Sequence, residues 1–253
     1  MEPRFGRLYA SAVLRPLAEQ MIELLGVRPG ETVSDLMCDG GTLGVALGAA
    51  VGHQGRVVVV DTDAGLLQTA WREVAATGCA VSTRVASGGA IPLVESSCDR
   101  VASLCTLGFW DGAGLIDSAE RATRAGGCAA VLTWDAEHPP VHETALAAAL
   151  RDVVGISSGF LARCLASPDP ARVARWKPVT VRDVVQFDGI GSYWAAAVVE
   201  RPVAGELAHQ SDEALRAVRA ACQRALEPCT AADGTMRIPV RATLWCFTRG
   251  AGG

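Results

Sequence analysis

The sequence predicts an α/β fold, in which a doubly wound and mostly parallel sheet is built from buried strands that alternate with helices. Five short apolar runs lie between residues 31 and 135, and segments with helical spacing separate them. The second run, RVVVVD, ends on a carboxylate, Asp61. Half of the 253 residues are hydrophobic and a fifth are charged, so the chain can bury one large core.

The first half of the chain follows the rhythm of a parallel sheet. Each apolar run is short enough for a buried strand, and turn residues bound it. The expected elements in chain order are a helix over 10–25, a strand that begins at residue 31, a strand over 56–61, a helix over 64–77, strands over 80–85 and 100–105, a helix over 117–124 and a strand over 128–135. We expect the glycine pair at residues 126 and 127 to separate the last helix from the fifth strand. The ligand crevice of such a sheet lies at the carboxyl ends of its strands.

The last third of the chain predicts two more strands, for a total of seven, and a helical cover over the crevice. The expected elements are helices over 141–154, 192–200 and 212–226, a helical or irregular stretch over 157–177, and strands over 179–187 and 237–249 that pair antiparallel at the sheet edge. We expect a single domain over residues 1–253. Its parts are an N-terminal helix region over 1–27, a cofactor-binding core over 28–137, cover segments over 138–178 and 188–235, and the last strand over 236–253.

The composition of the chain indicates which classes of binding partner to expect. The net charge of −4 and the absence of any basic run argue against nucleic-acid binding, and they favour a small-molecule partner. The nine cysteines are odd in number and never in CxxC spacing, so we expect neither a zinc ribbon nor a disulfide framework, and no metal. The first residues do not have the basic region and apolar core of a signal peptide, and no apolar stretch is long enough to span a membrane. We therefore expect a cytoplasmic protein without integral membrane association. The oligomeric state stays open, and a homodimer is compatible with the sequence.

The stretch over residues 31–44, ETVSDLMCDGGTLG, predicts a strand, a glycine turn and a helix N-terminus, an arrangement that brings backbone N–H groups close to a ligand. Asp61, twenty residues after Gly41, is placed to accept hydrogen bonds from a ribose. The dinucleotide fingerprint would need a glycine where Asp39 stands. The Tyr-x-x-x-Lys pair of many dehydrogenases is absent, because Lys177 is the only lysine.

The turn and several motifs further along the chain resemble the sequence motifs of one known family. VSDLMCDGG at residues 33–41 is similar to V-L-D-x-G-C-G-x-G, and ASGGAIPLVESSCDRV at residues 86–101 is similar to G-D-A-x-x-L-P-F…F-D-x-V. RATRAGG at residues 121–127 is similar to R-x-L-K-P-G-G, and the closing strand over 234–249 also fits. The chain therefore resembles class I S-adenosylmethionine-dependent methyltransferases, in particular those of the ubiquinone/menaquinone-biosynthesis type, over nearly its whole length.

The resemblance implies a Rossmann-like methyltransferase fold, S-adenosylmethionine as cofactor, and a set of residues that bind it. These residues are Asp35, Met37, Cys38, Gly40, Gly41, Asp61, Thr62, Ser87, Gly88, Cys105 and Thr106. Three positions depart from the family pattern, because Met37 and Asp39 replace glycines and Ser87 replaces an acid. A side chain in a turn that needs positive φ costs about 1 kcal/mol or more.

A sulfonium methyl group is already activated, so in-line positioning and exclusion of water carry most of the catalysis. A base is needed only for an acceptor that arrives protonated, and His138 and His142, just after the fifth strand, are the candidates. Candidates for an apolar substrate pocket are the aromatic residues Tyr9, Trp110, Trp134, Tyr193 and Trp194.

These features favour a methyltransferase that acts on a small organic molecule at an oxygen, nitrogen or carbon acceptor. The atypical turn keeps a second hypothesis open, a protein of the same fold that binds a ligand or catalyses another reaction. A nicotinamide-linked enzyme on the same half-sheet is a third, which the missing Tyr/Lys pair disfavours.

Overall fold

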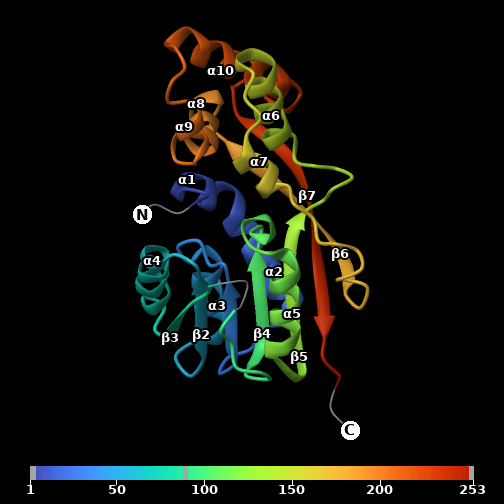
Figure 1. Ribbon diagram of the computed structural model, residues 1–253. Helices are drawn as coiled ribbons and strands as arrows, with labels where there is room; N and C mark the ends of the chain where they lie inside the picture. Colours follow the sequence, from blue (N-terminus) through green and yellow to red (C-terminus); the bar gives the residue numbers. More distant parts are fainter. Residues whose placement is uncertain (1–3, 88–90, 251–253) are drawn as a thin grey trace.

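The computed structural model describes residues 4–87 and 91–250, which form one seven-stranded sheet flanked by helices (Figure 1). The strand order is β3-β2-β1-β4-β5-β7-β6. The strands are β1 (Thr32–Leu36), β2 (Arg56–Asp61), β3 (Ala80–Val85), β4 (Cys98–Leu104), β5 (Thr123–Trp134), β6 (Lys177–Phe187) and β7 (Met236–Thr248). The order reverses between β1 and β4, and such a switch point is where α/β sheets bind their ligands.

Strands β1 to β5 pair in parallel, and β7 runs antiparallel to both β5 and β6. Leu132 of β5 faces Leu244 of β7, and Val181 of the edge strand β6 faces Ala242. This confirms the prediction of a mostly parallel, Rossmann-like sheet with an antiparallel pair at one edge. It also shows that β7, the last strand in sequence, lies inside that edge.

Helices cover both faces of the sheet, and with the strands they form two hydrophobic clusters. On one face lie α2 (Arg15–Leu25), α3 (Thr42–Val51) and α4 (Ala64–Ala75), whose apolar residues pack on alternate residues of β1, β2 and β4. On the other face α5 (Gly112–Ala122) packs with Leu115 and Ile116 against Val101 and Val131. The continuous apolar runs of β2 and β5 follow from this double burial.

The glycine pair does not separate α5 from the fifth strand, as the sequence had led us to expect. Strand β5 begins at Thr123, directly after α5, and the glycines lie inside it. Its register against β4 shifts between Thr123 and Cys128, and Gly126 has a φ of 76°. The pair therefore forms a bulge in the strand, a role that glycine's access to positive φ allows.

The N-terminal helix region is a chain of three segments, α1 (Arg7–Tyr9), the π-helical η1 (Ala10–Leu14) and α2. It starts three residues before the helix that the periodicity predicts, and it places Tyr9, Val13 and Leu17 in the larger hydrophobic cluster. In Figure 1, α1 lies between the carboxyl ends of the strands and the cover helices.

The cover is made of segments from the last third of the chain. These are α6 (Val141–Val154), α7 (Gly159–Cys164), α8 (Ile190–Trp194), η3 (Ala195–Val199), α9 (Val203–Glu206) and α10 (Asp212–Leu226). They gather above the carboxyl ends of the strands (Figure 1), and α6 packs against α10. Helices α6 and α10 have the predicted bounds, whereas the segment predicted over 192–200 divides into α8 and η3. None of the helices in the described ranges is long and apolar enough to span a membrane.

Candidate functional site

The turn after β1 keeps the backbone of a glycine turn although two glycines are replaced. Met37 has a φ of 58° and Asp39 a φ of 43°, followed by Gly40 at 87° and Gly41 at 100°. The left-handed region costs a residue with a side chain about 1–2 kcal/mol. The turn is tied down by the Gly41 amide, which donates to the Cys38 carbonyl at 2.7 Å. Met37 and Asp39, which replace glycines of the family pattern, thus have the positive φ that glycine favours.

Gly41 is required by its surroundings as well as by its φ. A Cβ atom at this position would lie 3.0 Å from the Cα of Ala70 in α4. Helix α3 begins at the next residue, Thr42, so the absence of a side chain lets the start of α3 approach α4. This close approach sets the position of the α3 N-terminus beside the carboxyl ends of β1 and β2.

Asp61 ends β2 and is fully buried. Its two carboxylate oxygens each accept a hydrogen bond from the guanidinium of Arg4, at 2.7 Å to Oδ1 and 3.1 Å to Oδ2. The amide of Asp39 donates to the same carboxylate at 3.2 Å, and the amide of Thr62 does so at 2.7 Å. A carboxylate that accepts two parallel bonds from one partner has the acceptor geometry that the two hydroxyls of a ribose also need.

Asp35, at the end of β1, is buried beneath the turn, and its Oδ2 has no hydrogen-bond partner among the described residues. Burial raises the pKa of Asp35 to about 8, and the charges of Asp61 and Asp39 contribute to the same direction. The carboxyl is therefore largely protonated at neutral pH. A buried polar atom without a partner at the turn fits a site that a polar ligand completes.

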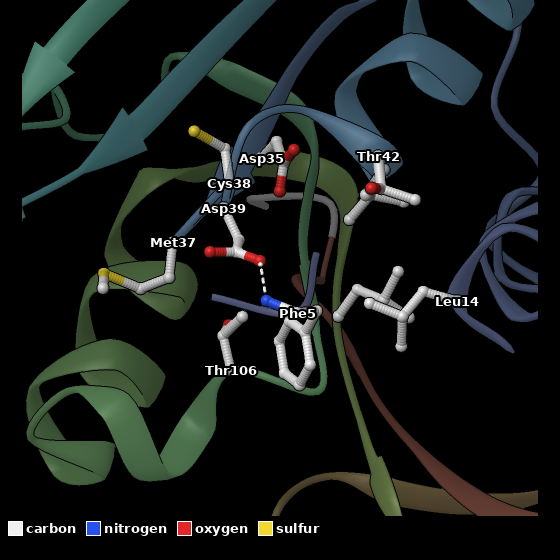
Figure 2. A pocket seen from close by; sticks show the side chains of 10 residues that line it. Phe5, Leu14, Asp35, Met37, Cys38, Asp39, Thr42 and Thr106 are labelled. Carbon is white, nitrogen blue, oxygen red and sulfur yellow. Dashed lines mark hydrogen bonds between the residues drawn. The ribbon is translucent and has the colours of Figure 1, made fainter. Parts of the chain in front are cut away.

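A cavity of only about 10 Å³ remains between these residues (Figure 2). Asp35, Met37, Cys38 and Thr106 line it, and the Phe5 ring fills its other side. Such a volume is about that of one water molecule. Arg4 on Asp61 and Phe5 beside the cavity thus occupy the space next to the turn.

The other predicted cofactor residues lie at the same edge of the sheet. The hydroxyl of Thr106 is within 2.8 Å of that of Ser103, and Cys105, buried, has a φ of 55°. Thr62 and Ser87 are exposed beyond the ends of β2 and β3. Gly88 lies outside the described residues.

A second polar cluster lies deep under the cover, around His142 and Glu143 at the start of α6. Both side chains are fully buried, as is Tyr9, whose hydroxyl contacts His142 Nε2 at 3.1 Å and donates to a Glu143 oxygen in a short hydrogen bond. Arg201 pairs with Glu143 at 3.0 Å, and its guanidinium lies 4.1 Å from the centre of the Tyr9 ring. We call these four residues the Tyr9–Arg201 cluster.

Burial and charge set the protonation states of this cluster. Burial lowers the pKa of His142 to about 4, so the imidazole is neutral at pH 7. Burial alone would raise the pKa of Glu143, but the neighbouring Arg201 and His142 outweigh it and the net shift is downward. Glu143 is therefore an ionised acceptor.

The structure brings some of the predicted aromatic residues together and separates another. Trp134 lies edge-on to His142 with ring centres 5.8 Å apart, and the Tyr193 hydroxyl donates to the His142 carbonyl at 2.6 Å. Trp194, the residue after Tyr193, is half-buried and packs against the larger hydrophobic cluster. Trp110 packs instead against the hydrophobic cluster on the opposite face of the sheet.

His138 does not join this group. Its side chain is 53% exposed and its Nδ1 lies 3.4 Å from Asp135 on the surface. Of the two histidines proposed from the sequence, His142 alone lies among the predicted aromatic residues.

Two arginines of the site have no signal in the sequence. Arg4 contacts residues 35 and 57 positions away, and Arg201 lies 58 positions from Glu143. A buried carboxylate needs a cationic or hydrogen-bonding partner, but nothing in the sequence tells which arginine supplies it.

Comparisons with known proteins agree with this geometry. Residues 33–127 match the family model described as a methyltransferase domain. The YcgJ protein of Bacillus subtilis is 14% identical, with 93% of this chain and 98% of that chain covered and a TM-score of 0.57. Geranyl diphosphate C-methyltransferase from Streptomyces coelicolor A3(2) is 15% identical, with 92% and 78% covered and a TM-score of 0.51. At such identities these structures show similarity of fold. A comparison with curated proteins gives no match.

The fold and the match agree: residues 33–127 match a methyltransferase domain, and they lie on a sheet of Rossmann-like methyltransferase topology. S-adenosylmethionine is the cofactor that the sequence resemblance predicts for such a domain. The ubiquinone/menaquinone type stays a prediction from the sequence.

Proposed function

We propose that the protein methylates a small organic molecule by in-line displacement, in an apolar pocket between the carboxyl ends of the strands and the helical cover. The observation that carries this proposal is the Nδ1 of His142, which has no hydrogen-bond partner within residues 4–87 and 91–250 and is buried beside Trp134 where β5 ends and the cover begins. A neutral imidazole with a free lone pair in an apolar setting is suited to take a proton from an acceptor.

The hydrogen-bond chain decides which nitrogen of His142 is free. The single proton of the Tyr9 hydroxyl is donated to Glu143, because the ionised carboxylate has no proton of its own to donate. The contact of 3.1 Å between Tyr9 and His142 then requires Nε2 to be the donor. This assigns the tautomer from the network and leaves Nδ1 as the basic atom. The imidazolium that forms on proton uptake would face the Glu143 carboxylate, 3.8 Å from Nε2.

The cofactor, when bound, supplies an activated methyl group. Asp61 would hold its ribose, the amides of the turn would approach it, and the free oxygen of Asp35 would accept one hydrogen bond from it. The cover of α6 to α10 would exclude water from the methyl acceptor. The aromatic side chains of Tyr9, Trp134 and Tyr193 would contact the apolar part of the acceptor.

A structural neighbour supports the class of acceptor. The geranyl diphosphate C-methyltransferase is described in complex with Mg2+, geranyl diphosphate and S-adenosyl-L-homocysteine, so that protein binds a small organic molecule on a similar fold. The side chains around His142 combine aromatic rings with one base, a combination that would suit an acceptor that is mostly apolar and carries one acidic or protonated group.

The first test is binding. We expect calorimetric titration to show that S-adenosylmethionine and S-adenosylhomocysteine bind and that NAD does not. Asp61→Ala should weaken binding by about 1–3 kcal/mol because charged hydrogen bonds are lost. Asp152→Asn, at a side chain that is 63% exposed, is the matched control and should bind as the wild type does. No binding of either sulfur ligand would refute the proposal.

The second test is turnover on a panel of small oxygen, nitrogen and carbon acceptors, with His142→Gln as the variant. Glutamine retains a donor for Tyr9 but has no basic atom. On an acceptor that arrives protonated, kcat should fall by about 10²–10⁴-fold with cofactor affinity unchanged. Cofactor binding without any methylated product would favour the second hypothesis, a ligand-binding protein or an enzyme of another reaction, to which the filled cavity also points.

A further inference from the structure

Residues 4–6, which we call the N-terminal strap, occupy the place where the cofactor site is built. Both oxygens of Asp61 are engaged by the Arg4 guanidinium, which leaves the arginine side chain 19% exposed. The backbone of the strap is held by Asp39, whose carboxylate accepts from the Arg4 amide at 2.7 Å and from the Phe5 amide at 3.1 Å. Figure 2 shows the Phe5 amide directed at Asp39.

The Phe5 side chain is buried at the mouth of the small cavity. It is 1% exposed, stacks on Tyr9 with ring centres 5.9 Å apart, and meets Phe109 edge-on at 5.8 Å. The strap thus joins the turn of the cofactor site to the Tyr9–Arg201 cluster. A ligand that reaches Asp61 and the cavity has to displace both Arg4 and Phe5.

Gly6 gives the strap a point about which it can move. Its φ of 69° and ψ of 163° lie in a region that is open to glycine almost alone. A Cβ atom there would lie 2.6 Å from Cβ of Glu200 and 2.7 Å from the Glu200 carbonyl oxygen. Beyond Gly6, helix α1 is fixed to the cover, because the Leu8 amide donates to the Glu200 carboxylate at 2.7 Å. The strap and α1 are thus held by different partners, Asp39 and Asp61 for the strap and Glu200 for α1.

We propose that the N-terminal strap is an autoinhibitory element that closes the cofactor site of the ligand-free protein, with Arg4 on the carboxylate that a ribose needs. The inference rests on the proposed function and adds the regulation of its site. Asp61 already accepts two bonds from Arg4 and one each from the amides of Asp39 and Thr62, which uses about four lone-pair positions. A diol therefore has to replace Arg4, so strap and cofactor compete for Asp61. The apparent dissociation constant is then the intrinsic one divided by the fraction of open protein.

The test compares the wild type with Arg4→Gln by calorimetric titration with S-adenosylhomocysteine. Glutamine cannot make the bidentate contact, and a strap that is closed in about nine molecules of ten predicts that the variant binds about tenfold more tightly. Arg7→Gln, at an exposed arginine three residues further on, is the matched control and should bind as the wild type does. Gly6→Ala is a second variant that disturbs the strap without touching the site carboxylates, and it should also bind more tightly.

The outcomes separate the strap from the proposed function. Equal affinity of wild type and Arg4→Gln would overturn the strap and leave the cofactor site intact. Weaker binding by Arg4→Gln would also overturn it, because Arg4 would then belong to the bound site. If neither Arg4→Gln nor Gly6→Ala binds the ligand, the strap and the proposed function both fail.

Hydrogen exchange provides a readout that is independent of affinity. The Phe5 amide is protected in the closed form by its bond to Asp39, so addition of saturating S-adenosylhomocysteine to the wild type should increase its exchange. The Leu8 amide, held by Glu200, should keep its protection. Unchanged protection of Phe5 with the ligand bound would overturn the proposal.

Discussion

Replacing Asp35 by asparagine should stabilise the ligand-free protein, and the gain should depend on pH. Asp35 is fully buried, and one of its oxygens has no partner among the described residues. Its pKa is raised from 3.8 to about 8, chiefly because burial disfavours the carboxylate. Between these two values the unfolded chain loses this proton and the folded protein keeps it. The free energy of unfolding therefore falls as the pH rises from about 4 to about 8.

The size of the effect follows from the pKa. Each pH unit between the unfolded and folded values removes about 1.4 kcal/mol, so Asp35 lowers the stability by about 4 kcal/mol at pH 7 relative to pH 4. Asparagine has the same shape and no charge to desolvate, so the variant lacks this loss. The difference in unfolding free energy between Asp35→Asn and the wild type should be small near pH 4, grow with pH, and level off above pH 8.

Urea unfolding at pH 5, 7 and 9, followed by circular dichroism, measures this difference. Asp152→Asn, at an exposed side chain, is the control for the removal of a carboxylate from the surface. A constant difference between Asp35→Asn and the wild type across this range would refute the reasoning, because it would show that Asp35 ionises in the folded protein as easily as in the unfolded chain.

Two further predictions concern the packing of the site. Glu143→Gln should lower the free energy of unfolding by about 3–5 kcal/mol, because Arg201 would be left buried without its ionic partner. In urea unfolding, the double variant Glu143→Gln/Arg201→Met should recover part of this loss. No recovery would contradict an ionic cause. Gly41→Ala should cost more than Gly52→Ala by the same measurement, because both have positive φ but only Gly41 would place a Cβ 3.0 Å from the backbone of α4. Equal losses would show that φ alone matters.

The sequence carried most of the fold because strands buried on both faces show as continuous apolar runs. VVVV before Asp61 predicts β2 directly, and the bounds of α6 and α10 follow from helical spacing. The bulge at Gly126 was not predictable, because a glycine pair before a strand is equally consistent with a loop. The π-helical segment over Ala10–Leu14 has the same apolar spacing as an α-helix, so periodicity does not reveal it.

The site was predictable where backbone geometry fixes it and not where a distant side chain completes it. Asp61 and the turn lie at a strand end that the topology places beside the ligand crevice. The pairing of Tyr9 with His142 joins residues 133 positions apart, and that of Arg4 with Asp61 joins residues 57 apart. Such contacts depend on the packing of α1 under the cover, for which the local pattern contains no information.

The atypical turn and the strap explain each other. Asp39 stands where the family pattern has a glycine, and its positive φ costs about 1–2 kcal/mol. Its carboxylate holds the amides of Arg4 and Phe5, and hydrogen bonds to a charged acceptor contribute about 1.5–3 kcal/mol each. A glycine would avoid the strain but could not hold the strap. The substitution that weakens the resemblance to a methyltransferase turn is thus the residue that fixes residues 4 and 5 over it, so the same position accounts for both the strained backbone and the closed site.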